Sequence, residues 1–179
     1  AERLRARVLR LAAAGGPAPD WSDAGLLASI EDWLGPRLWG LRRAEDLAGI
    51  DLVGALRDAL GFEGLARLDA ALPEAFETPA GARRPIDYGR PAPTVSLRAQ
   101  ELYGFDDRPE AAGAPISFEL LSPAGRPIAT TADLPGFWRG AWADVRKDMR
   151  GRYPKHDWPE RPWDAAPWRG GRAGAGSRG

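Results

Sequence analysis

The chain of 179 residues has no cysteine, no asparagine, one histidine, one methionine and two lysines. The absence of cysteine excludes disulfides and thiolate metal sites. A zinc site needs about four nitrogen or sulfur ligands, and His156 alone cannot supply them. A Ser-His-Asp triad would also depend on His156, and no nucleophile elbow is present. We therefore expect no catalytic residue, no metal and no cofactor in this chain.

A Gly-Lys pair is also missing, which excludes a phosphate loop of the GxxxxGK type. Lys147 follows Arg146, and Lys155 follows Pro154. The letters GxGxxG occur at 174–179, but no strand precedes them and no helix can follow. ATP hydrolysis by a P-loop mechanism is therefore not expected of this chain.

Two further absences concern location and completeness. There is no signal peptide and no apolar run of about 18 residues, so the sequence predicts a soluble, cytoplasmic protein without a membrane partner. There is also no initiator methionine, and we expect a fragment or a processed piece of a longer protein.

The formal net charge is zero, but the charge is unevenly distributed. Residues 137–179 carry a net charge of +5, and residues 1–136 carry −5. The C-terminal third is therefore better suited to face an anion. A solvated surface explains the same charges, and the arginine richness is typical of a codon bias, so charge alone leaves the question open.

Apolar residues at helical spacing predict a bundle of short helices in residues 1–72. Leu4, Val8 and Leu11 share one face of the first helix. Gly35-Pro36 is expected to end the second helix, and Pro73 the last. The helices are expected at 1–13, from Asp20 or Ser22 to 34, near 44–48, from 51 to 60 and at 65–72.

The pattern changes after Pro73, where the apolar period shifts from 3.6 toward 2. Ile116, Phe118 and Leu120 alternate with polar residues, which predicts a half-buried strand. The fold class is therefore α+β, with a small antiparallel sheet that can close like a barrel. The expected strands are 85–88, 94–97, 116–120 and 126–130, with a short helix at 98–102.

Residues 133–162 are rich in tryptophan and are expected to organise the fold. Trp138, Trp142, Val145 and Met149 fall on one stripe of a helix. Asp133 can cap its start and Gly151 can stop it. An extended, proline-rich clamp then follows, anchored by Tyr153, Trp158 and Trp163. The remaining tail, 164–179, has the low complexity typical of a disordered segment.

Residues 120–162 read LLSPAGRPIATTADLPGFWRGAWADVRKDMRGRYPKHDWPERP. This stretch resembles the C-terminal hallmark of the bacterial HrpB family of ATP-dependent RNA helicases, which are of the DEAH/RHA type. Trp142 stands where the family more often has tyrosine. Upstream, PAGARRPIDYGRPAPTVSLRAQELYG is similar to a second family pattern, with Tyr103 in place of phenylalanine. The resemblance covers roughly residues 20–163.

The resemblance implies three parts: an accessory helical bundle at 1–72, a β-rich C-terminal domain at 73–163, and the tail. It also implies a parent enzyme whose motor domains, absent here, lie in the same chain and use ATP and magnesium. This segment would support that motor without hydrolysing ATP itself. Its role would be to bind single-stranded RNA or, alternatively, to dock the motor as a structural module without RNA contact.

Seven side chains are candidates for contact with RNA because cations suit phosphate. His156 has an alternative role, in which it hydrogen-bonds a carbonyl and pins the extended segment, and we favour that role. Arg126 lies in a turn, where it either binds RNA or ties the turn to the helix. The stripe formed by Trp138 and Trp142 favours a core position over base stacking. The seven candidates are Arg126, Arg139, Arg146, Arg150, Arg152, Lys155 and His156.

Overall fold

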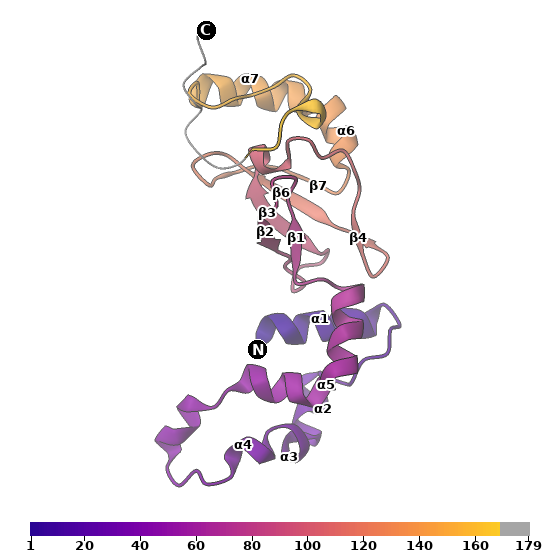
Figure 1. Cartoon of the computed structure of the whole chain (residues 1–179), viewed down its shortest axis with the longest axis vertical. Coiled ribbons are helices and arrows are strands. Elements are labelled where there is room, and N and C mark those ends of the chain that lie inside the picture. Colours follow the sequence, from indigo (N-terminus) through magenta and orange to yellow (C-terminus); the bar gives the residue numbers. More distant parts are fainter. Residues whose placement is uncertain (169–179) are drawn as a thin grey trace. The chain divides into compact units, whose positions relative to one another are not determined.

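The computed structural model describes residues 1–168 and divides the chain into two compact units, Ala1–Pro73 and Glu74–Gly179 (Figure 1). We call them unit 1 and unit 2. Most of the tail predicted to be disordered, from residue 169 on, lies outside the described residues. Among the described helices, none is long and apolar enough to cross a membrane.

Unit 1 is built from helices, as its apolar periodicity predicts. In α1, Leu4, Val8 and Leu11 are buried on one face, which confirms the predicted stripe. The long helix α5 begins at its predicted cap, where the Asp51 carboxylate accepts a hydrogen bond of 2.9 Å from the Gly54 amide. The helices are α1 (Glu2–Ala13), α2 (Asp23–Ala28), α3 (Ile30–Trp33), α4 (Gly35–Leu38), the 3₁₀ helix η1 (Ala44–Gly49) and α5 (Leu52–Ala71).

The sequence predicts one continuous helix up to residue 34, but the structure has two shorter helices here. Ser22 caps α2, as predicted, by accepting from the Gly25 amide at 3.1 Å. The Ser29 hydroxyl donates to the Gly25 carbonyl at 2.8 Å, and the helix breaks there into α2 and α3. Gly35 does not stop the chain of helices, because Pro36 occupies the first turn of α4, where its missing N–H costs nothing.

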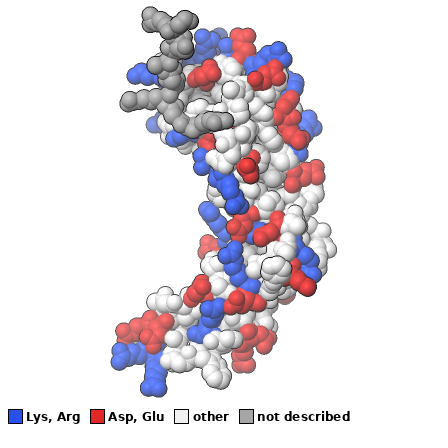
Figure 2. Space-filling model, in the orientation of Figure 1, with Lys and Arg blue, Asp and Glu red and all other residues white. Residues whose placement is uncertain are grey.

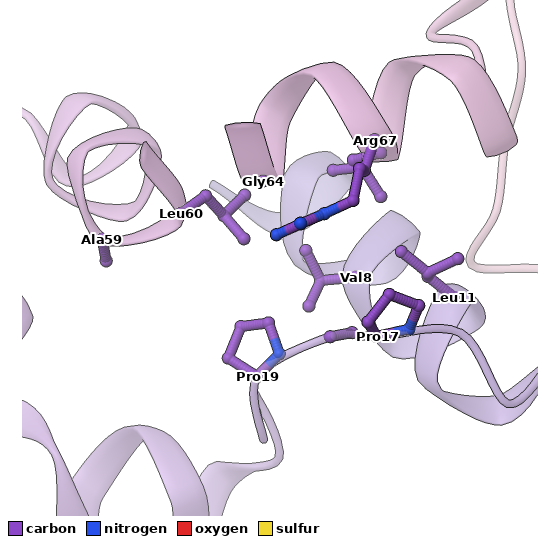
Figure 3. Close-up of a pocket in the computed structure, with 10 residues that line it drawn as sticks. Val8, Leu11, Pro17, Pro19, Ala59, Leu60, Gly64 and Arg67 are labelled. Atoms are coloured by element: carbon purple, nitrogen blue, oxygen red, sulfur yellow. The ribbon is translucent and has the colours of Figure 1, made fainter. Parts of the chain in front are cut away.

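A kink divides α5 at Gly61, whose φ of +65° lies in the left-handed region. The sequence predicts two helices here, and the kink separates them near the predicted place. Leu56 and Leu68 are buried on either side of it, whereas Leu52 is 42% exposed. An apolar pocket of about 140 Å³ lies beside the kink (Figure 3). Its wall includes Leu60 and Arg67.

Unit 2 contains three small sheets. The central one has the order β3-β6-β7, in which β3 is parallel to β6 and β6 is antiparallel to β7. Two hairpins, β1–β2 and β4–β5, are separate. The strands are β1 (Ala75–Glu77), β2 (Arg83–Pro85), β3 (Thr94–Arg98), β4 (Glu110–Ala111), β5 (Ala114–Pro115), β6 (Ser117–Leu121) and β7 (Pro127–Thr131).

This topology shows that the prediction of a purely antiparallel sheet with barrel-like closure was wrong. A parallel pair needs a long crossover, and the chain between β3 and β6 supplies one that contains η2 (Ala99–Leu102) and the β4–β5 hairpin. Residues 85–88 form only the end of β2 and an isolated bridge from Asp87 to Thr94. The strands of the described residues therefore remain in three separate sheets.

The tryptophan-rich segment forms two helices, α6 (Leu134–Arg139) and α7 (Trp142–Arg152), where one was predicted. The chain breaks at Gly140, whose ψ of −97° is not helical. Asp133 caps α6 as predicted, since its carboxylate accepts from the Gly136 amide at 2.9 Å. Gly151 does not stop α7, which runs on to Arg152.

Candidate nucleic-acid interface

The segment after α7 is held to the protein by its carbonyl groups. Its prolines remove backbone N–H donors, so the oxygens carry most of its hydrogen-bonding capacity. The Trp142 indole donates to the Pro159 carbonyl at 2.9 Å, and Arg146 Nε donates to the Trp158 carbonyl at 2.8 Å. The indole of Trp158 donates to the Tyr153 carbonyl at 3.0 Å. Donors on aromatic and arginine side chains thus fix the segment that follows α7.

The region just after η2 holds the same segment from a second direction. The Tyr103 hydroxyl donates to the Asp157 carbonyl at 3.0 Å, and the Gly104 amide donates to the Pro162 carbonyl at 2.8 Å. Burial, together with the nearby Asp157 carboxylate, raises the pKa of the Tyr103 phenol. The phenol therefore stays protonated and remains a donor at neutral pH.

Four aromatic rings surround Trp142. Its ring centroid lies 5.0 Å from Trp138, 6.0 Å from Trp158, and 6.2 Å from both Phe137 and Tyr103. Trp142 is 1% exposed. Trp138, Met149 and Trp158 are buried as well, whereas Val145 is half-buried. The core position predicted for Trp138 and Trp142 is confirmed, and these rings have no face on which a base could stack.

An open hollow of about 450 Å³ lies between α7 and the segment that follows it. Arg146 and Arg150 stand one helical turn apart on α7. The buried Trp158 belongs to the wall, and His156 is exposed. The lining residues are Arg146, Arg150, Pro154, His156, Asp157 and Trp158.

The arginines of unit 2 divide into paired and unpaired side chains. Arg139 binds both carboxylate oxygens of Asp106, at 2.7 and 2.5 Å, and its guanidinium lies 4.7 Å from the centroid of the Trp163 ring. Arg152 pairs with Asp148 at 3.0 Å. Arg139 and Arg152 are thus engaged within the protein, which limits the cationic edge predicted along the helix.

Arg146 is oriented by the protein as well. It donates to the Trp158 carbonyl and pairs with Glu160 at 2.9 Å, and its side chain is 22% exposed. By contrast, the structure gives the side chains of Arg126, Arg150 and Lys155 no ion pair or hydrogen bond within residues 1–168. Within the described part of the chain, Arg150 is therefore a cation of the hollow without an ion pair, beside an arginine that is held in place.

Basic and acidic side chains are interspersed on the face shown in Figure 2. Asp157 also lines the hollow, so its charge opposes that of Arg150. Arg126 lies in the turn between β6 and β7 and is not among the lining residues. Of the seven candidate residues, three line the hollow: Arg146, Arg150 and His156.

Comparison with known proteins identifies the family. Residues 33–162 match the model of the ATP-dependent helicase C-terminal family HrpB_C. The chain belongs to this family. It is 42% identical over 166 residues to the ATP-dependent RNA helicase HrpB of Escherichia coli K12, covering 89% of this chain and 20% of that protein.

Two crystal structures of E. coli HrpB share the fold. One, described as a DExH-box NTPase, has a TM-score of 0.87 at 40% identity and covers 93% of this chain and 21% of its own. The other, described as a DEAH/RHA helicase, has a TM-score of 0.72 at 38% identity and covers 88% and 20%. The chain therefore spans about a fifth of the HrpB proteins that it matches.

Sequence reasoning named Trp158 as an anchor of the segment after α7, but it identified neither the hollow nor the pairing of Asp106 with Arg139. Asp157 and Trp158 line the hollow, and Asp106 forms an ion pair with Arg139. A signal for Asp157 was available, because it directly follows His156. No sequence signal pairs Asp106 with Arg139, which stands 33 residues away. No group of three or more histidine, cysteine, aspartate or glutamate side chains in the described residues is arranged to hold a metal.

The pair of Arg139 and Asp106 predicts a pH dependence of stability. Hydrogen bonds from Arg139 hold the pKa of the Asp106 carboxyl below its usual range, and the arginine charge adds to this while burial opposes it. A carboxylate whose pKa is lowered in the folded state stabilises the fold at pH values above its ordinary pKa. This stabilisation is lost as the pH falls through the pKa of the folded state. Asp106→Asn should therefore lower the urea midpoint at neutral pH.

The comparison is between urea midpoints of wild type and Asp106→Asn from about pH 7 down to about pH 2. The difference between the two urea midpoints should disappear at the lowest pH, where Asp106 is protonated in the wild type. Glu119, whose pKa is lowered by hydrogen bonds from Ser96 and Arg90, titrates in both proteins and cancels. A difference between the midpoints that stays constant with pH would show that the charge of the Asp106 carboxylate does not cause it.

Proposed function

We propose that this chain is an accessory C-terminal region of an ATP-dependent RNA helicase and that it holds single-stranded RNA at the hollow beside α7. The motor domains, which we place in the same polypeptide, would bind ATP and magnesium and perform hydrolysis. E. coli HrpB, which this chain matches, is an ATP-dependent RNA helicase. This chain would keep the strand or the motor in position without catalysing a reaction itself.

The observation that carries the proposal is that Arg150, which has no ion pair within residues 1–168, lies beside the oriented Arg146. A guanidinium presents several donors in a fixed plane, which suits the oxygens of a phosphate. Arg146 already uses Nε and one terminal nitrogen within the protein, so Arg150 would make the main contact. His156, which also lines the hollow, would contribute a ring N–H donor. Asp157 would limit the affinity and disfavour a densely charged ligand.

A docking role is the alternative, and one observation favours it. Arg139, Arg146 and Arg152 all pair with carboxylates of the same chain. Exposed pairs of this kind add little stability, but they neutralise the surface that RNA would use. A module of this composition could serve to cover the motor without touching RNA.

The test is binding of a fluorescent oligouridylate to the 179-residue chain, titrated across salt concentrations. Arg150→Gln should weaken binding several-fold at low salt and reduce the salt slope by about 0.7, the loss of one phosphate contact on a single strand. The matched control is Arg83→Gln, which removes the same charge from an exposed position of β2 outside the hollow. It should leave the slope closer to that of the wild type.

Three outcomes separate the proposals. A loss specific to Arg150→Gln supports RNA contact at the hollow. Equal losses of affinity for both variants would show that net charge alone explains the effect, and they would reject the hollow as a site. No binding by the wild type at low salt would favour the docking role.

A further inference from the structure

A second feature of the chain, in unit 1, presents an indole to solvent on a hydrogen-bonded turn. Trp39 has φ −61° and ψ 127°, and Gly40 has φ +83°. These values match the two central positions of a type II turn, where the second needs a positive φ. The Leu41 amide closes the turn on the Leu38 carbonyl at 3.2 Å. Trp39 is 89% exposed at the tip of this turn.

Two arginines follow this turn on a fixed backbone. The Asp46 carboxylate accepts hydrogen bonds from the backbone amides of Arg42 and Arg43, at 3.2 and 3.1 Å. Asp46 is thereby engaged with the main chain. The structure gives the arginine side chains no partner among the residues that it describes, and both residues are exposed.

An indole and two guanidinium groups in this arrangement suit one class of ligand. Aromatic rings stack on the faces of nucleic-acid bases in single strands without regard to sequence, and nearby cations meet the backbone phosphates. A type II turn fixes the backbone at Trp39 before binding, so less backbone freedom is lost on contact. An apolar partner protein would use the ring but not the two arginine side chains.

We propose that Trp39, Arg42 and Arg43 form a stacking site for a base of single-stranded RNA, with the two arginines on the adjoining phosphates. The choice of RNA rests on the proposed function, but the residues are independent of the hollow in unit 2. A docking surface for another protein is the competing role of the exposed ring.

The experiment compares Trp39→Ala, Trp39→Phe and Phe62→Ala in the oligouridylate titration. Phe62 is the matched control, because it is 88% exposed in the same unit and none of the next four residues is arginine. Trp39→Ala should weaken binding about five- to tenfold. Trp39→Phe should retain part of the affinity, since a phenyl ring still stacks, and Phe62→Ala should bind like the wild type. Circular dichroism of each variant checks the fold.

The outcomes separate this site from the proposed function. If Arg150→Gln weakens binding and Trp39→Ala does not, the hollow stands and the Trp39 site is rejected in favour of a docking surface. Equal losses for Trp39→Ala and Phe62→Ala would also reject it, as a nonspecific apolar effect. No RNA binding by the wild type would overturn both proposals. A loss confined to Trp39→Ala, with partial rescue by phenylalanine, supports the stacking site.

Discussion

Replacing Trp142 with alanine is expected to lower the free energy of unfolding of unit 2 by about 3–5 kcal/mol, the range for a fully buried large side chain. Trp142 is 1% exposed and has four aromatic neighbours. Its truncation would leave a cavity among rings that cannot easily collapse. It would also remove the donor for the Pro159 carbonyl, so the segment after α7 would lose one of its attachments.

Hydrogen exchange measured peptide by peptide tests this prediction, because it reports unit 2 separately from unit 1. Peptides of β3, β6 and α7 should lose protection in Trp142→Ala. Trp142→Phe should fall between the two, since it keeps a ring and loses the indole donor. Trp39→Ala removes the same atoms from an 89% exposed position and should change stability by no more than about 0.5 kcal/mol. Unchanged protection in Trp142→Ala would show that the aromatic cluster is not the core of unit 2.

The parts of the fold that sequence predicts are those set by local periodicity. The spacing of Leu4, Val8 and Leu11 fixes which face of α1 is buried, and the alternation of Phe118 and Leu120 fixes which face of β6 is buried. Caps at Ser22 and Asp133 follow from side-chain chemistry within three residues. Each of these depends on near neighbours in the chain, so the sequence contains the information directly.

The parts that sequence did not predict depend on distant partners. Alternation in residues 94–97 predicts a strand but not the direction of its neighbour, so the parallel pairing of β3 with β6 was missed. Gly140 interrupts a helix that periodicity alone would continue through Trp138 and Trp142. Helical spacing shows which side chains share one face of a helix, but it does not show whether the helix is continuous. The break at Gly140 was therefore also missed.

The candidate site shows the same limit. Sequence identified the cations of the C-terminal third, but their roles depend on which carboxylates the fold brings near them. Asp106 and Glu160 occupy Arg139 and Arg146, whereas Arg150 has no such partner within residues 1–168. A charge count therefore finds the region, and only the three-dimensional arrangement distinguishes a free cation from a paired one.

The buried Arg7 predicts the second large effect, in unit 1. Its side chain is 4% exposed, and it donates from Nε and a terminal nitrogen to the Leu72 carbonyl, at 2.8 and 2.6 Å. Leu72 is fully buried at the end of α5, where helix carbonyls lack partners and a cation is favourable. Arg7 thus caps a helix that ends 65 residues later in the chain.

Arg7→Met is expected to destabilise unit 1 by about 3 kcal/mol, because methionine keeps much of the apolar stem while the Leu72 carbonyl stays buried without its charged donor. Asp69→Asn is the control, since Asp69 also contacts Arg7, at 2.5 Å, but is 57% exposed and should cost less than about 1 kcal/mol. Hydrogen exchange should show the loss in peptides of α1 and the end of α5. If both variants cost the same, the ion pair with Asp69 and not the capped carbonyl would be what Arg7 contributes to the stability of unit 1.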